Sequence, residues 1–166
     1  MTDQRLEMRA AIGLGAVGLA LLLGALGFQY LGGFPPCEMC HWQRWPHIAA
    51  AVAGLGGGGL IAAGVLPARL GLGLALMAAL LVALSGVIGV YHAGVEWKWW
   101  EGPASCAGTA FSLDGSLEDA LAGARIVRCD EAPWRLAGLS LAGYNALFSL
   151  GAAALGIFVL TRRKTP

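Results

Sequence analysis

Four cysteines in two pairs are the residues of this sequence that could do chemistry. Cys37 and Cys40 form a CxxC motif directly after a long apolar run, whereas Cys106 and Cys129 are spread over a polar stretch between two later apolar runs. Two thiols that can close into a disulfide can exchange two electrons with another such pair. The cysteine pattern therefore predicts thiol–disulfide chemistry.

The residues that follow the CxxC motif favour a reactive thiol. A helix N-terminus or a nearby cation lowers the pKa of a thiol and makes its thiolate available. We expect a helix that begins just after Cys40, with Pro46 in its first turn, so that the positive end of the helix dipole faces the pair. Arg44 adds a permanent positive charge at the same place.

Two other kinds of site are compatible with these residues. The run from Cys37 to His41 satisfies the CxxCH signature of covalent c-type haem, in which His41 would be one axial ligand and His47, His92 or a methionine the other. This haem hypothesis leaves the second cysteine pair without a role. A zinc site on all four thiols is the third possibility, although structural zinc sites usually take their ligands from two close pairs.

The composition places the cysteines in a membrane protein. Of the 166 residues, 57% are hydrophobic and only 13% are charged, whereas soluble domains carry about a quarter charged residues. A membrane helix needs about 20 apolar residues to cross roughly 30 Å of hydrocarbon. The runs of this length predict spans at approximately 10–31, 47–66, 70–92 and 136–160. They lack the alternation of barrel strands, so we expect an all-α, four-helix transmembrane bundle that forms a single integral membrane domain over residues 1–166.

The charges that flank the spans predict the orientation. Lys and Arg are enriched in cytoplasmic loops. One end of the bundle carries six basic and two acidic residues, and the other carries five basic and eight acidic residues. The basic residues of the first end are Arg5, Arg9, Arg69, Arg162, Arg163 and Lys164. We therefore expect both termini in the cytoplasm and all four cysteines on the outer, oxidising side, where disulfides persist.

The stretch between Cys106 and Cys129 predicts a second redox loop with a helix of its own. Ser116 and Asp119 resemble a capping signal, and leucines at 113, 117 and 121 recur on one helical face. A short amphipathic helix lying on the membrane is expected here, with an ordinary surface helix as the alternative.

Several motifs together resemble a known family. The segment CEMCHWQR at 37–44 is similar to the CxxCxxQR signature of the bacterial inner-membrane thiol oxidoreductase family DsbB. Further similarities are the segment 91–96, the segment 100–103 that leads to Cys106, and the pair Cys129-Asp130 before the last span. Vitamin K epoxide reductases share a four-helix redox plan, but their CxxC motif follows the loop cysteines. The resemblance covers nearly the whole chain.

The resemblance implies a disulfide-generating enzyme, namely a quinone-dependent protein thiol oxidoreductase. In such enzymes the loop pair oxidises a periplasmic, DsbA-like dithiol oxidase. Here Cys106 would form the mixed disulfide with this partner, and Cys129 would resolve it. Cys37 would then exchange with the loop pair, and Cys40 would meet a membrane quinone, either ubiquinone or menaquinone.

The resemblance also implies a quinone site and a cellular location. Arg44 would hold the charge of Cys40 and polarise a quinone oxygen, and His92 matches a family residue near the quinone. Gln43 and Glu96 are further candidates at this site. The expected location is the bacterial inner membrane, with the cysteines facing the periplasm. The expected partners are the DsbA-like oxidase, the quinone pool and the lipid bilayer, and neither a metal nor a nucleic acid is expected.

Overall fold

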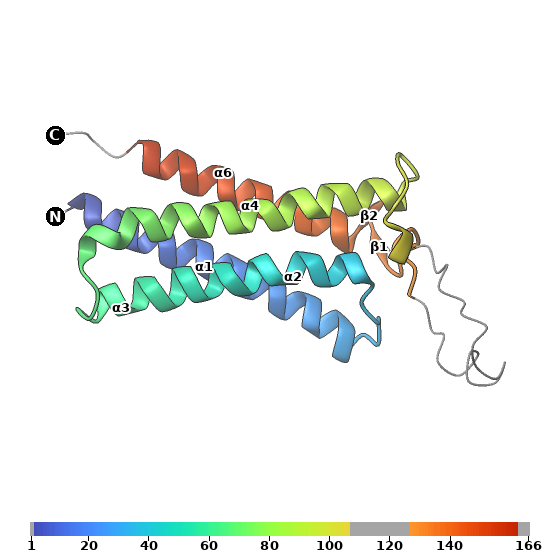
Figure 1. Cartoon of the computed structure of the whole chain (residues 1–166), viewed down its shortest axis with the longest axis horizontal. Helices are drawn as coiled ribbons and strands as arrows, with labels where there is room; N and C mark the ends of the chain where they lie inside the picture. The colour runs from blue at the N-terminus through green and yellow to red at the C-terminus, as the bar shows by residue number, and fades with distance from the viewer. Residues whose placement is uncertain (1, 107–126, 163–166) are drawn as a thin grey trace.

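The computed structural model of the protein describes residues 2–106 and 127–162. The protein is a bundle of long helices (Figure 1). In chain order these helices are α1 (Thr2–Tyr30), α2 (Glu38–Ala51), the π-helix η1 (Val52–Gly57), α3 (Gly58–Ala62), the 3-10 turn η2 (Ala68–Leu70), α4 (Gly71–Glu96), the 3-10 turn η3 (Ala104–Cys106) and α6 (Leu141–Thr161). Two short strands, β1 (Arg135–Leu136) and β2 (Leu139–Ser140), precede α6. Because α2, η1 and α3 follow one another without a break, they form one long helix.

Within residues 2–106 and 127–162, four helical segments are long and apolar enough to cross a membrane. They are Asp3–Tyr30, Glu38–Ala62, Ala68–Glu96 and Leu141–Thr161. The predicted all-α, four-helix transmembrane bundle is therefore confirmed. The start of α1 and the end of α6 lie at one end of this bundle, and the end of α1, the start of α2 and the end of α4 lie at the other (Figure 1). The amphipathic helix expected near 113–124 lies outside the described residues.

The start of α2 differs from the sequence-based expectation. The helix begins at Glu38, before Cys40, because the sulfur of Cys37 takes the N-cap role and accepts a hydrogen bond from the backbone N–H of Cys40 at 3.2 Å. The prediction of a helix starting after Cys40 was wrong, and so was the placement of Pro46 in its first turn. Pro46 lies inside α2, where its ring removes one backbone hydrogen bond from the helix.

Glycines bring the helices close together where they cross. A Cβ atom added to Gly15 of α1 would lie 2.6 Å from the backbone nitrogen of Leu55, so these two helices touch backbone to backbone. A Cβ atom on Gly89 of α4 would lie 2.9 Å from the carbonyl oxygen of Ala142 in α6 and 3.2 Å from the side-chain nitrogen Nδ2 of Asn145. Gly89 thus allows α6 to approach α4 closely enough for Asn145 to enter the interior.

A tight hairpin fixes the entry into α6. Strand β1 pairs antiparallel with β2, and the two turn residues, Ala137 and Gly138, both have positive φ angles, of 48° and 85°. This is the combination that a two-residue hairpin turn of type I′ requires. Ser140 then caps α6 by accepting a hydrogen bond from the backbone N–H of Gly143 at 3.1 Å. The hairpin therefore connects the segment after Cys129 rigidly to the last helix.

Candidate active site

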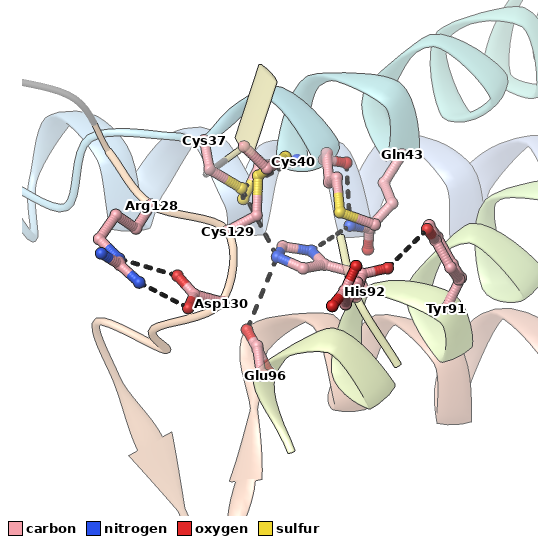
Figure 2. The surroundings of a disulfide bond; sticks show 12 residues. Cys37, Cys40, Gln43, Tyr91, His92, Glu96, Arg128, Cys129 and Asp130 are labelled. Carbon is pink, nitrogen blue, oxygen red and sulfur yellow. Dashed lines mark hydrogen bonds and ion pairs between the residues drawn. A yellow bond between two sulfur atoms is a disulfide. The ribbon is translucent and has the colours of Figure 1, made fainter. Parts of the chain in front are cut away.

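The structure brings the four cysteines together at the N-terminus of α2. Cys37 and Cys40 are free thiols with their sulfurs 2.8 Å apart, whereas Cys106 and Cys129 form a disulfide (Figure 2). Cys37, Cys106 and Cys129 are all buried in one cluster with Met39 and Val95, and Cys40 packs against this cluster. Thiol–disulfide exchange between the two pairs therefore needs no large movement of the chain.

The sulfur of Cys37 makes more polar contacts than the sulfur of Cys40. It lies 2.8 Å from the sulfur of Cys40, accepts the backbone N–H of Cys40, and lies 3.6 Å from Nε2 of His92. The pKa of Cys37 is raised above its usual range, chiefly because of its hydrogen bond to the sulfur of Cys40 and then because of burial. Cys37 is therefore the thiol of this pair that keeps its proton.

A hydrogen-bond chain fixes the ring of His92. The side-chain amide nitrogen of Gln43 donates to the backbone carbonyl of Met39 at 3.1 Å and to Nδ1 of His92 at 2.9 Å. Because Nδ1 accepts, the proton of the neutral ring is on Nε2, the nitrogen that faces Cys37. Nε2 also lies 3.8 Å from a carboxylate oxygen of the buried Glu96 (Figure 2).

The chain continues into the bundle through polar residues, of which the sequence had suggested only His47, as a haem ligand. Asn145 of α6 donates to the amide oxygen of Gln43 at 2.8 Å and accepts a bond from Nε2 of His47 at 2.8 Å. Ser85 and Ser149 join the same network. The available signal was the presence of polar residues inside apolar spans, because such residues are costly in lipid and usually mark function.

An apolar cavity of about 360 Å³ opens beside this network. Phe28, Trp134, Tyr144 and Phe148 form one wall, with ring centroids 5.0 Å apart for Phe28 and Trp134 and 6.1 Å apart for Tyr144 and Phe148. Aromatic side chains packed in this way provide a surface for a flat apolar ring. The cavity therefore suits a lipid-soluble aromatic or quinonoid molecule.

The polar side of the cavity contains the predicted cofactor residues Cys40, Arg44 and His92. Arg44 donates from Nη1 to the side-chain oxygen of Gln29 at 2.6 Å, but its Nε has no hydrogen-bond partner among the described residues. A buried N–H without a partner is costly, and a carbonyl oxygen would satisfy it. The residues present thus fit a quinone headgroup, because they offer aromatic walls, a free donor and an adjacent thiol.

The metal and haem hypotheses fit this geometry less well. Cys37, Cys40 and His92 place ligand atoms within 4.8 Å of one another. However, the imidazole nitrogen that faces the sulfurs carries the proton, so it offers a metal no lone pair. The disulfide between the other two cysteines excludes a site on all four thiols in this state. His41, which a c-type haem would need as an axial ligand, is exposed.

Charged residues hold the segment around Cys129 against the end of α4. Asp130 bonds Arg128 through both carboxylate oxygens, at 2.9 and 2.7 Å, and also pairs with Lys98. These bonds, first from Arg128 and then from Lys98, lower the pKa of Asp130 below its usual range. The pairs are largely exposed, so they orient the segment more than they stabilise the fold.

An aromatic contact holds the other loop cysteine. The ring of Trp100 lies directly over Gly94 and stacks on Tyr91 with centroids 6.0 Å apart, and its indole N–H donates to the carbonyl of Tyr91 at 2.8 Å. This folds the chain after α4 back onto the helix. The turn that contains Cys106 is thereby held beside Cys37.

Comparisons with known proteins agree with the site. The family model for disulfide bond formation protein DsbB matches residues 7–159. A disulfide bond formation protein B from Marinobacter nauticus is 30% identical over 157 residues, which cover 88% of this chain and 87% of the relative. A protein of the same name from a Polaromonas species is 29% identical over 151 residues, covering 87% of this chain and 84% of the relative.

A third disulfide bond formation protein B, from Burkholderia thailandensis, is 39% identical over 84 residues, which cover 51% of this chain and 44% of the relative. No solved structure matches the chain significantly. The match to the family model covers all four spans almost entirely and includes all four cysteines. The chain therefore belongs to the DsbB family of disulfide bond formation proteins.

Proposed function

We propose that this protein is a quinone-dependent thiol oxidase that keeps a periplasmic, DsbA-like dithiol oxidase in its disulfide form. Members of the family act in disulfide bond formation, and the chain is a multi-pass membrane protein. The observation that carries the proposal is the single buried cluster that joins both cysteine pairs, one of which borders the apolar cavity. Such an arrangement can move electrons from a soluble dithiol into the membrane.

The proposed relay is a series of balanced exchanges. A partner dithiol gives two electrons and two protons to the Cys106–Cys129 disulfide and becomes a disulfide itself. The reduced loop pair then passes the two electrons and two protons to a Cys37–Cys40 disulfide, so that the loop disulfide is restored and the CxxC pair is reduced. The described state, with a loop disulfide and two free CxxC thiols, corresponds to the end of this second exchange.

The final oxidant in the proposal is a membrane quinone. A bound quinone would take two electrons and two protons and leave as a quinol. The aromatic wall would hold its ring, and the free Nε–H of Arg44 would donate to one of its oxygens beside Cys40. Ubiquinone and menaquinone both present such oxygens, so either fits this part of the site.

The proposed location is the bacterial inner membrane, with the cysteines in the periplasm. Basic residues predominate at the end of the bundle that carries the termini, and acidic residues predominate at the cysteine end. In bacteria the DsbA–DsbB–quinone route keeps the periplasm oxidising, which is the compartment that the proposed relay would serve.

Purified protein in detergent, a reduced DsbA-like dithiol oxidase and a soluble quinone analogue test the proposal. We expect one quinone to be reduced for each partner disulfide formed. Cys106→Ala should abolish partner oxidation but leave oxidation of the Cys37/Cys40 pair by quinone intact, whereas Arg69→Ala, at the other end of the bundle, should behave as wild type. Near wild-type oxidation of the partner by Cys106→Ala would overturn the relay.

A further inference from the structure

We propose that Asn145 is a positioning residue of the redox site, because it holds Gln43 in the one orientation in which His92 presents an N–H to the sulfur of Cys37. This inference rests on the proposed thiol relay and adds a role for the last helix, which carries no cysteine. Asn145 itself touches none of the sulfurs in the described structure. It acts through two intervening side chains.

Two backbone carbonyls determine the direction of the whole chain of bonds. The amide nitrogen of Asn145 donates to the carbonyl oxygen of Ser85 at 3.2 Å and to the side-chain oxygen of Gln43 at 2.8 Å. The amide nitrogen of Gln43 donates to the carbonyl oxygen of Met39 at 3.1 Å and to Nδ1 of His92 at 2.9 Å. A carbonyl oxygen can only accept, so each amide has a defined orientation.

The reversed orientation places like groups together. If the Gln43 amide turned over, its oxygen would face the oxygen of Met39 and its nitrogen would face the nitrogen of Asn145. If Asn145 turned over as well, its oxygen would face the oxygen of Ser85. Each reversal leaves buried polar groups unpaired, at a cost of about 1–3 kcal/mol for each group. Nδ1 of His92 is therefore held as an acceptor and Nε2 as the donor.

The hydrogen on Nε2 lies where negative charge develops during exchange. In the relay, Cys37 forms a mixed disulfide with one loop cysteine. When the thiolate of the other loop cysteine attacks that bond, the loop disulfide forms, the bond to Cys37 breaks, and its electron pair leaves on the sulfur of Cys37. Nε2 of His92 lies 3.6 Å from this sulfur, and a fixed donor at a developing anion lowers the barrier.

The neighbours of Nε2 show why its proton matters. Besides Cys37 they include a carboxylate oxygen of Glu96 at 3.8 Å, and the His92 ring also bonds the backbone of Cys129. A bare nitrogen in this position would repel the thiolate and the carboxylate together. The Nε2–H tautomer instead offers the sulfur of Cys37 a hydrogen-bond donor between the CxxC motif and the loop.

The test measures the tautomer and the exchange rate separately. In the full-length protein in detergent micelles, the ¹⁵N shifts of the His92 ring report which nitrogen carries the proton. We expect Nε2–H in wild type. Asn145→Leu removes the donor to Gln43 at similar volume, and should give mixed tautomers and slow loop-to-CxxC exchange in a single turnover by about 10-fold. The exchange is measured without quinone, because Asn145 also lines the cavity proposed for it.

Two further variants keep the test decisive. Gln43→Glu replaces the donor with a carboxylate and should invert the tautomer to Nδ1–H, even if Asn145→Leu folds poorly. Thr161→Ala removes a side-chain hydrogen bond at the far end of the same helix, from Oγ1 to the carbonyl oxygen of Phe158 at 2.9 Å, and should leave both the tautomer and the exchange rate as in wild type.

The outcomes separate this inference from the proposed function. Wild-type exchange rates with an unchanged Nε2–H tautomer in both Asn145→Leu and Gln43→Glu would overturn the role of Asn145 and leave the relay intact. A wild-type protein whose two cysteine pairs do not exchange at all would overturn the relay itself.

Discussion

At the scale of single residues, Arg44 limits what the cavity can bind. Its guanidinium is anchored on one side by Gln29 of α1, and Nε–H has no partner in the part of the chain that the structure describes. Charges and donors act more strongly in apolar surroundings than in water. The free donor therefore selects a ligand with an acceptor oxygen at that point.

Replacing this donor should affect the quinone step alone. We expect Arg44→Ala to raise the apparent quinone KM by about 10-fold, the effect of losing one hydrogen bond to a charged group. Arg44→Lys should recover only part of the loss, because a single ammonium cannot bond Gln29 and a ligand with the planar geometry of a guanidinium. Steady-state quinone titration measures this. Equal quinone dependence in all three proteins would show that Arg44 does not bind the quinone and is only a charge at the membrane interface.

The raised pKa of Cys37 predicts a specific loss of stability in alkali. In the folded state Cys37 keeps its proton at pH values where the thiol of an unfolded chain loses it. This stabilises the fold fully below the usual thiol pKa, and the stabilisation is lost as the pH rises from there towards the folded pKa. Reduced wild-type protein should therefore lose thermal stability above about pH 9, and Cys37→Ala should lose less over the same range. Parallel slopes of Tm against pH in the two proteins would contradict this.

At the scale of elements, the connection after α4 determines where Cys106 lies. Gly94 has no side chain, and the ring of Trp100 occupies the space that a Cβ atom would need. The contact was visible in the sequence only as part of a family motif. The structure supplies its physical reason, which is the fold of the chain back onto the helix.

Adding one methyl group at Gly94 should disturb this connection. Gly94→Ala should displace Trp100, lower stability by about 1–3 kcal/mol as overpacking does, and slow oxidation of the partner by way of Cys106. Gly73→Ala is the matched control in the same helix, because a Cβ atom there meets nothing within 4 Å. Thermal unfolding and tryptophan near-UV dichroism measure the difference. Equal stability in the two variants would show that Trp100 does not depend on Gly94.

At the scale of the whole molecule, the sequence predicted the bundle well and the interior network poorly. Long uncharged runs must become helices in lipid, so the four-helix fold followed from composition and length. The start of α2 was misplaced because a cysteine, an unusual cap, replaced the common Ser, Thr, Asp or Asn. The link between Asn145 and Gln43 depends on how closely Gly89 lets α6 approach α4, and sequence spacing within one helix does not determine such contacts.

The proposed orientation of the bundle predicts which positions can be reached from outside the cell. In a variant without native cysteines, Leu31→Cys lies at the end that carries the redox site, at a position 92% exposed. An impermeant thiol reagent should label it in intact cells. Arg69→Cys, at the opposite end and also exposed, should be labelled only after the cells are broken. The reverse pattern would invert the topology.

The most direct test of the relay is the position of the disulfides after one turnover without quinone. Fully oxidised protein is mixed with one equivalent of the reduced partner, the thiols are trapped in acid, and the disulfides are mapped by non-reducing mass spectrometry. If the two pairs exchange, the protein should reach the described state, with the Cys106–Cys129 bond present and Cys37 and Cys40 free. A reduced loop pair beside an intact Cys37–Cys40 disulfide would show that the two pairs do not exchange and would contradict the account.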